Sequence, residues 1–287
     1  MKKFAVIDVG SNSVRLMFVA DGKVLYKKLN TTRLGEGLAE APYLKTEAIE
    51  RSALAVAEFY KLAKAEGAEN VCMFATAATR SAKNGYAFTN RVKELCGLEV
   101  DVVSGETEAL LGITGALGTT DGGVIDIGGA STEIVLQKDG AIVYAKSIDI
   151  GVVRLKDLCG RNEEKLLETA TTYVRKFGDV KTDLPIYAIG GTATTLGAVY
   201  LGDGVYDPEK ITGLALSKET VKGMAKKLLS MSVEEVAALP GMLPKRADII
   251  GGGATLLAVI METFGFDKVI ISDSDNLEGY AKRKGLF

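Results

Sequence analysis

The chain of 287 residues contains no histidine, only three cysteines and five prolines. No apolar run reaches the roughly 18 residues of a membrane-spanning helix. Without histidine, Ser-His-Asp and Cys-His catalysis, phosphohistidine intermediates and histidine-ligated metals are excluded. A general base acting near neutral pH must be an aspartate, glutamate, lysine, tyrosine or cysteine. Any metal must be bound by oxygen atoms, which favours Mg²⁺ or Mn²⁺.

The three cysteines, Cys72, Cys96 and Cys159, are odd in number and too widely spaced for a disulfide framework or a CxxC metal pair. We expect them to be buried, reduced thiols. The apolar segment near the N-terminus meets Asp8 too soon to be the core of a signal peptide. These features predict a cytoplasmic protein without a membrane partner.

Neither sign of charge is in large excess, since 35 Lys plus Arg stand against 37 Asp plus Glu, for a net charge of −2. No global basic excess indicates nucleic acid, and we expect none as a partner. A polyanionic substrate would still need a local basic patch. Composition is that of an ordinary globular protein, and the length suffices for one large domain or two modest ones.

Two similar segments are the most informative part of the chain. Residues 4–13 read FAVIDVGSNS, and residues 122–133 read GGVIDIGGASTE. Each predicts a buried strand that ends in an aspartate, Asp8 or Asp126, and a tight turn of glycine and hydroxyl residues. Such a turn can present backbone N–H groups to a phosphate, and the carboxylate can hold a metal or its water. Because two unrelated hairpins rarely need the same carboxylate and hydroxyls, the duplication favours a functional role over a plain β-turn.

The order of predicted elements repeats as well. Three strands begin each half, and a Gly/Thr-rich link at 117–122 separates the halves, which predicts an α/β protein and excludes a solenoid. The predicted strands are 4–9, 14–19, 23–29, 71–74, 99–103, 123–127, 132–137, 141–150, 186–189 and 269–272. The predicted helices are 47–66, 86–96, 105–118, 163–177, one ending at 200, 217–230, 233–238, 245–264 and 276–285. Residues 202–214 are expected to be irregular.

Three further segments offer candidate groups. The run 188–194 predicts a strand that passes through a glycine turn into a helix, whose N-terminus could bind an anion. In the run 104–108, Glu106 and Glu108 point to different faces of a helix, so only one can face a cleft, and a first-turn glutamate is also favoured by the helix dipole alone. Arg80 follows a strand and could bind a phosphate oxygen, although a lone arginine is more often solvated. A Walker-type phosphate loop is absent.

Together these motifs resemble the exopolyphosphatase / guanosine pentaphosphate phosphohydrolase (Ppx/GppA) family. The matching runs cover essentially the whole chain: AVIDVGSNSVRL, FATAATRSAKNG, VVSGETEALL, GVIDIGGASTEIVL, SIDIGVVRL, AIGGTATTLGA and RADIIGGG with VIISDSDNLEGYA. The resemblance implies two ribonuclease-H-like domains of the actin-like ATPase superfamily with a cleft between them. Domain I would comprise residues 1–119 and 276–287, and domain II residues 120–275.

The resemblance also implies a reaction, the release of terminal phosphate from inorganic polyphosphate by a metal-activated water. By position, Glu108 is the expected general base, and Arg80 the expected phosphate-binding arginine. Asp8, Asp126 and Glu133 would hold Mg²⁺ or Mn²⁺, with Asp126 and Glu133 also positioning water. The expected phosphate cradle consists of Ser11, Asn12, Ser13, Gly128, Gly129, Ala130, Ser131, Gly191 and Thr192.

Guanosine pentaphosphate is the alternative substrate within this class, and an actin-like nucleotide-binding regulator with little turnover is the alternative from another class. A homodimer is left open. The chain departs from the family pattern at Leu110, where arginine is frequent, and at Ala130, where glycine is frequent. It also carries Asp275 and Leu277 where the family's Gly-Leu-Arg-Glu-Gly run has glycine and arginine. The helical HD-type domain of longer members is not expected, since histidine is absent.

Overall fold

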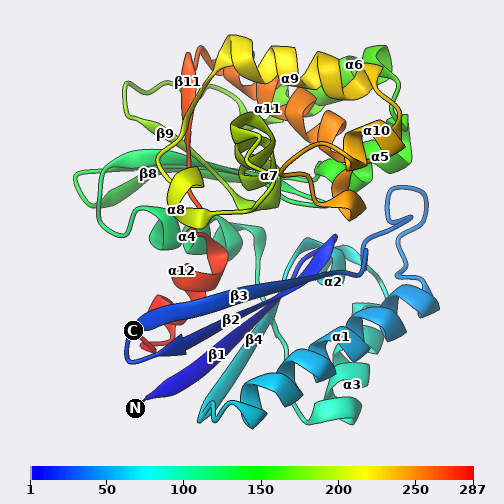
Figure 1. Cartoon of the computed structure of the whole chain (residues 1–287), viewed down its shortest axis with the longest axis vertical. Coiled ribbons are helices and arrows are strands. Elements are labelled where there is room, and N and C mark those ends of the chain that lie inside the picture. Colours follow the sequence, from blue (N-terminus) through cyan, green and yellow to red (C-terminus); the bar gives the residue numbers. More distant parts are fainter. Residues whose placement is uncertain (1) are drawn as a thin grey trace.

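The computed structural model describes residues 2–287 and contains two mixed β-sheets, one in each half of the chain (Figure 1). The first has the strand order β3-β2-β1-β4-β5. Its strands are β1 (Lys3–Val9), β2 (Ser13–Ala20), β3 (Lys23–Thr31), β4 (Asn70–Ala75) and β5 (Asp101–Val102). β1 pairs antiparallel with β2 and parallel with β4. Almost every residue of β1 is buried, as expected of a central strand covered on both faces.

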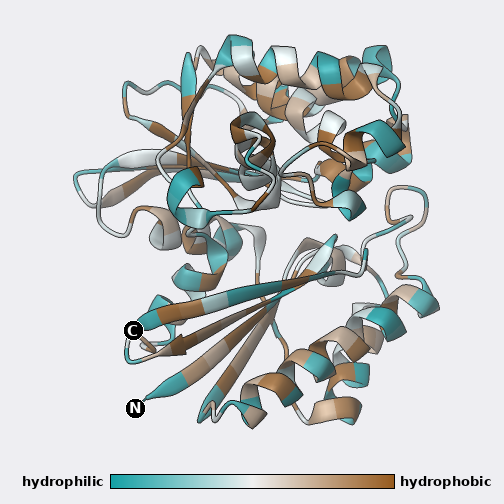
Figure 2. Ribbon diagram, in the orientation of Figure 1, coloured by the Kyte–Doolittle hydropathy of each residue, from teal (hydrophilic) through white to brown (hydrophobic). Residues whose placement is uncertain are grey.

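Helices α1 (Thr46–Ala65) and α3 (Gly85–Cys96) cover one face of this sheet. In α1 the buried side chains recur three or four positions apart, so Ile49, Val56 and Phe59 lie on one stripe that packs against the sheet. Figure 2 shows hydrophobic positions along the strands and hydrophilic positions on the outer faces of the helices. The short helix α2 (Ala77–Ser81) follows β4 directly.

The second sheet has the strand order β10-β11-β9-β6-β7-β8. Its strands are β6 (Gly122–Ile127), β7 (Thr132–Lys138), β8 (Ala141–Ile148), β9 (Ile186–Ile189), β10 (Ala215–Ser217) and β11 (Lys268–Ile271). The helices of this half are α5 (Val152–Cys159), α6 (Glu163–Val174), α7 (Gly190–Leu201), α8 (Pro208–Ile211), α9 (Lys218–Ser230), α10 (Val233–Ala237) and α11 (Ile250–Phe264). Two 3₁₀ turns span Arg175–Phe177 and Pro244–Arg246.

Two helices lie between the sheets, α4 (Gly105–Ala116) and α12 (Asn276–Arg283) (Figure 1). One face of α4 packs on the second sheet through Ala109 and Ile113. Its opposite face contacts α12, which in turn covers the first sheet, where the rings of Tyr280 and Phe74 stack with centroids 4.5 Å apart. The helices touch backbone to backbone, since a Cβ atom on Gly279 would lie 1.9 Å from the carbonyl oxygen of Leu111.

The expected α/β class and the three-strand start of both halves agree with this structure. The expected assignment of the last helix to domain I and the boundary at residue 119 stay predictions, because α4 lies before that boundary and packs on both sides. Within residues 2–287, no helix is long and apolar enough to cross a membrane.

Several element bounds differ from the sequence expectation. The helix expected at 245–264 begins at Ile250, because Pro244 starts a 3₁₀ turn that ends at Arg246. The strand expected at 99–103 has only two residues. Helix α5 was missed, as were α2, α8 and β10. α5 has only eight residues and lies between Gly151 and Gly160, so its periodic signal is short.

Candidate active site

The two repeated turns contact each other between the sheets. In each turn a glycine N–H donates to a serine carbonyl at 3.0 Å, Gly10 to Ser13 and Gly128 to Ser131. A Cβ atom on Gly129 would lie 2.7 Å from the Cβ atom of Ser11, so only glycine allows this approach. The repeat predicted from the sequence therefore forms two walls of one site.

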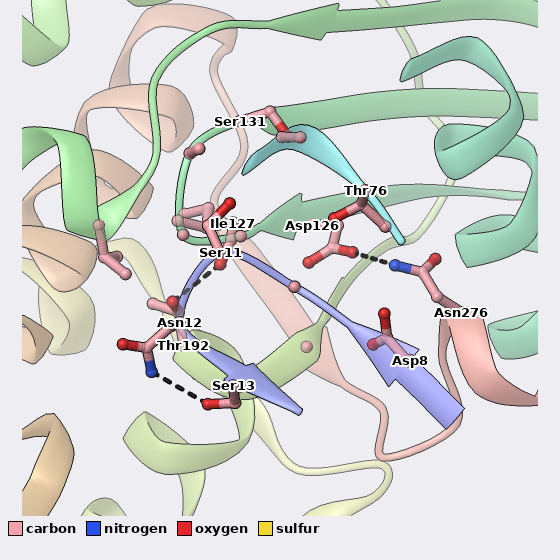
Figure 3. Close-up of a pocket in the computed structure, with 18 of the residues that line it drawn as sticks. Asp8, Ser11, Asn12, Ser13, Thr76, Asp126, Ile127, Ser131, Thr192 and Asn276 are labelled. Atoms are coloured by element: carbon pink, nitrogen blue, oxygen red, sulfur yellow. Dashed lines mark hydrogen bonds between the residues drawn. The ribbon is translucent and has the colours of Figure 1, made fainter. Parts of the chain in front are cut away.

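A small pocket of about 80 Å³ lies between these turns (Figure 3). It is lined by the predicted Asp8, Glu108 and Asp126 and by all nine residues of the expected phosphate cradle. The remaining lining residues are Gly10, Arg15, Thr76, Ala77, Ile127, Val152, Gly190, Arg246 and Asn276. Both halves of the chain, α4 and α12 thus contribute to one polar pocket.

Helix α7 presents its N-terminus to this pocket. Its N-cap residue, Ile189, has no side chain that can bind the first N–H groups, which suits an anion. Gly190 has a φ of 74°, and a Cβ atom there would lie 2.5 Å from Oδ1 of Asp126, so glycine makes room for that carboxylate. The start of α5 differs, because the N–H groups of Val152 and Val153 already donate to carbonyl oxygens of the second turn.

Asp8 occupies the pocket end of β1 beside a cation. Its Oδ2 accepts a hydrogen bond from Nε of Arg15 at 2.8 Å, and the same guanidinium bonds Asp275. Oδ1 of Asp8 is buried and has no hydrogen-bond partner among residues 2–287. Burial raises the pKa of Asp8, against the attraction of Arg15. Asp8 therefore offers one carboxylate oxygen to whatever enters the pocket.

Asp126 occupies the corresponding end of β6 without a cation in contact. Its Oδ2 accepts a hydrogen bond from Nδ2 of Asn276 at 2.9 Å (Figure 3). Burial, with the negative charge of Asp275 next in size, raises the pKa of Asp126 to about 6. Burial also opposes ionisation of Asp275, but Arg15 and Lys27 hold the pKa of Asp275 below its usual value.

Glu108 reaches the pocket from the first turn of α4. Ser104 caps this helix, its Oγ accepting from the N–H of Thr107 at 3.0 Å. Oε2 of Glu108 accepts from Nη1 of Arg80 at 3.0 Å. Burial raises the pKa of Glu108 to about 7, although Arg80 pulls in the opposite direction. Glu106, two residues earlier, is exposed, so the geometry selects Glu108 as the glutamate that faces the cleft.

Two expected site residues lie outside the pocket lining. Arg80 is held between Glu108 and the carbonyl oxygen of Val103. Glu133 lies opposite Asp126 on β7, where its Oε1 accepts from Ser147 at 2.6 Å. Burial, with Glu108 and Asp126 nearby, raises the pKa of Glu133 well above its usual value. Both residues are adjacent to pocket carboxylates without facing the pocket themselves.

The expected metal set of Asp8, Asp126 and Glu133 is not assembled as a protein cage. Among residues 2–287, no three His, Cys, Asp or Glu side chains are grouped closely enough to hold a metal ion. Mg²⁺, however, is commonly bound by one or two carboxylates together with substrate phosphates and water. The unpartnered Oδ1 of Asp8 and the carboxylate of Asp126 fit that smaller requirement.

Arg246 is the functional candidate that sequence reasoning missed. It is buried, and no carboxylate within the described chain forms an ion pair with it. A Cβ atom on Gly191 would lie 2.1 Å from its Nη2, so the guanidinium sits against the glycine backbone. Burial and the nearby charge of Arg15 lower the pKa of Arg246 to about 10. A buried cation without an anion is a strong attractor for phosphate.

Comparison with known proteins places this chain in a family. The chain matches the model of the Ppx/GppA phosphatase family over residues 5–284. The chain belongs to this family. The resemblance inferred from the motifs is thereby confirmed, and with it the reaction class, phosphoanhydride hydrolysis.

Ppx/GppA relatives of two lengths match the chain. Exopolyphosphatase 2 of Mycobacterium tuberculosis is 30% identical, and the match covers 98% of both chains. A guanosine-5'-triphosphate,3'-diphosphate pyrophosphatase of Vibrio atlanticus is also 30% identical, with 99% of this chain but 58% of the relative covered. A bifunctional 3-dehydroquinate synthase/phosphatase of Fusobacterium nucleatum is 31% identical, with 45% of its length covered. The chain thus spans about half the length of the last two relatives.

A solved structure agrees with the family assignment. The crystal structure of the Aquifex aeolicus Ppx/GppA family member has 30% sequence identity and a TM-score of 0.80, with 99% of this chain and 98% of that chain covered. The α/β fold class predicted from the sequence, with two domains, is confirmed by this likeness.

Proposed function

We propose that this protein is an exopolyphosphatase that removes the terminal phosphate of inorganic polyphosphate. The observation that carries the proposal is the meeting of two glycine-hydroxyl turns around three carboxylates and an unpaired buried arginine. The terminal phosphate would lie between the turns, against the N-terminus of α7. The relative that matches over its whole length is named an exopolyphosphatase, which supports this choice of substrate.

Glu108 acts as the general base in this proposal. A pKa of about 7 suits proton transfer near neutral pH, because half of the carboxyl is then ionised. As the oxygen of a water molecule bonds to the terminal phosphorus, its proton passes to Glu108. The bridging P–O bond breaks, and orthophosphate leaves a chain that is one phosphate shorter. Arg80 orients the carboxylate, and its charge limits the rise of the Glu108 pKa.

The other groups position the substrate and neutralise the charge of its phosphates. Arg246 and the N–H groups of the two turns would bind the phosphate oxygens, whose charge would otherwise repel the carboxylates. Asp8 and Asp126 would hold Mg²⁺ together with the substrate. When bound, this ion would neutralise phosphate charge and lower the pKa of water. Glu133 would act through Asp126, its cross-strand neighbour.

Guanosine pentaphosphate is the second candidate substrate, and one observation favours it. A larger pocket of about 980 Å³ adjoins the phosphate pocket and shares Arg15, Gly190, Gly191 and Arg246 with it. Its lining includes Tyr206 and several exposed aliphatic side chains, which could accept a nucleoside. The Vibrio relative carries a name of this specificity, although it is much longer than this chain.

The experiment is phosphate release with Mg²⁺ from long polyphosphate, tripolyphosphate, guanosine pentaphosphate and ATP in parallel. Glu108→Gln should lower kcat by about 10²–10⁴-fold, the usual contribution of a general base. The matched control is Glu106→Gln, which alters the exposed glutamate of the same helical turn and should keep most of the activity. Retained activity in Glu108→Gln would remove the base assignment. Binding of ATP without phosphate release from any substrate would instead assign the protein as a nucleotide-binding regulator.

A further inference from the structure

The phosphate pocket and the larger pocket adjoin and share four lining residues. Both are lined by Arg15, Gly190, Gly191 and Arg246, so a substrate that extends from the first into the second passes between two arginines. The volumes of about 80 and 980 Å³ mean that only the terminal part of a phosphate chain fits the first pocket. The charges at this junction therefore act on the phosphates that follow the terminal one.

The two junction arginines differ in their partners. Arg246 has no ion pair within the described residues, whereas Arg15 is bonded by Asp8 on one side and Asp275 on the other. Asp275 is only 3% exposed and lines the larger pocket. Two buried carboxylates thus offset the single positive charge of Arg15, and Arg246 remains the available cation.

The larger pocket does not supply the missing positive charge. Four basic and five acidic side chains line it. Lys27, one of the basic four, is already bonded to Asp273 and Glu278. A long polyanion entering this pocket would gain no net attraction, and it would meet Asp275 directly after the junction.

The cap that Asp275 makes on α12 does not need the carboxylate charge, although the ion pair with Arg15 does. Asp275 caps α12 through Oδ1, which accepts from the N–H of Leu277 at 3.0 Å. Asparagine caps helices as well as aspartate does.

We propose that Asp275 is a specificity-determining residue that disfavours long polyphosphate chains, so that the protein prefers short inorganic polyphosphates such as tripolyphosphate. This inference rests on the proposed exopolyphosphatase function. It adds to that function the preference for chain length and the residue responsible. A tripolyphosphate places at most two phosphoryl groups beyond the phosphate pocket, whereas a long chain must continue past Asp275.

The test compares Asp275→Asn with the unaltered protein on tripolyphosphate and on polyphosphate of several hundred units. Removal of one partly screened charge near the chain should lower KM for the long substrate, relative to that for tripolyphosphate, on the order of threefold to tenfold. The matched control is Asp203→Asn, which changes net charge equally at an exposed site, paired with Lys210, outside both pockets. It should leave the ratio of the two KM values unchanged. An unchanged or reversed ratio in Asp275→Asn would overturn the inference.

Binding measurements separate this inference from the proposed function. Dissociation constants of both polyphosphates are measured by calorimetry on Glu108→Gln protein, with and without Asp275→Asn. The same relative gain for the long chain is expected there. If the unaltered protein hydrolyses neither polyphosphate, the proposed function fails, while the binding ratio still decides the role of Asp275. A thermal melt of Asp275→Asn shows whether the cap is preserved.

Discussion

The first hairpin, β1–β2, and the second hairpin, β6–β7, have the same type of turn but differ in charge. Asp8 of β1 pairs in register with Arg15 of β2, whereas Asp126 of β6 pairs with Glu133 of β7. The hydrogen bonds that close the turns have the same length, 3.0 Å. The repeated motif therefore determines the backbone of the site, and the residue across the hairpin determines its electrostatics.

The two aspartates therefore lie in different electrostatic surroundings. The first hairpin places the cation of Arg15 beside Asp8. The second places Asp126 opposite Glu133, and burial, followed by neighbouring negative charges, raises the pKa values of both. The duplicated hairpin thus carries an ion-paired aspartate in its first copy and two facing carboxylates in its second.

The largest expected effect comes from neutralising each aspartate separately. Asp8→Asn breaks the ion pair with Arg15 but also removes a buried charge whose pKa is raised, so we expect the free energy of unfolding at pH 8 to change by less than about 1 kcal/mol. Asp126→Asn removes a buried charge that has only an amide partner, and we expect stability at pH 8 to stay the same or rise by about 1–3 kcal/mol. Urea denaturation at pH 8 measures the free energy of unfolding of both variants and of the unaltered protein. Equal changes in the two variants would mean that the two hairpins are electrostatically alike.

A second prediction concerns pH and stability. The pKa of Glu133 is raised in the folded protein, so the folded state binds more protons than the unfolded state above about pH 4.5, and stability falls as pH rises. Glu133→Gln should remove part of this fall, on the order of 1–3 kcal/mol between pH 5 and pH 8. Denaturation curves at several pH values provide the test. Glu106→Gln, at an exposed site, is the control, and a slope that is the same in Glu133→Gln and the unaltered protein would contradict the prediction.

Much of the site could be predicted because it is local. Asp8, Asp126 and the two turns follow from short motifs whose backbone needs glycine and hydroxyl residues. Glu108 was selected by the family resemblance, and the structure shows the reason, since its neighbour Glu106 points to solvent. The role of each of these residues stays a prediction until activity is measured.

The remaining site residues depend on long-range packing. Arg246 is the first residue of the run RADIIGGG, but nothing in that run indicates a role for it, and only the fold brings it from its 3₁₀ turn against Gly191. The contact of Arg15 with Asp275 joins residues 260 positions apart. The expected metal set of Asp8, Asp126 and Glu133 stays a prediction, and the bond of Glu133 with Ser147 of β8 is a contact that no spacing in the sequence indicates.

A third prediction tests the proposed general base, Glu108, through the pH profile of the reaction. With Glu108 as base and a pKa of about 7, kcat/KM should rise tenfold per pH unit below pH 7 and level off above it. Arg80→Met removes the cation that lowers this pKa, so the limb should move to higher pH by about one unit. Arg91→Met, in an exposed ion pair on α3, is the control. If the acidic limb of the pH profile does not shift in Arg80→Met, Arg80 does not set the pKa of Glu108.

The smallest expected effect concerns Asn276, which holds Asp126 through a neutral hydrogen bond. Asn276→Leu removes the donor while keeping a similar shape, and Mg²⁺ affinity should fall about threefold, since the carboxylate loses its orientation. Mn²⁺ binding measured by calorimetry gives a readout independent of turnover. Lys282→Ala, on the same helix, should leave metal affinity unchanged. An effect larger than that of Asp126→Asn would make Asn276 more than a positioning residue.

The contacts of α12 with the first sheet and with α4 also have a consequence for protein synthesis. Residues 276–283 leave the ribosome after both sheets have emerged, yet they cover Phe4 and Phe74 of the first sheet and supply Asn276 to the pocket. Until then the nascent chain exposes an apolar surface that chaperones can bind. A chain interrupted before residue 276 would lack both the cover and the amide. Completion of the first half and completion of the pocket are therefore the same late event.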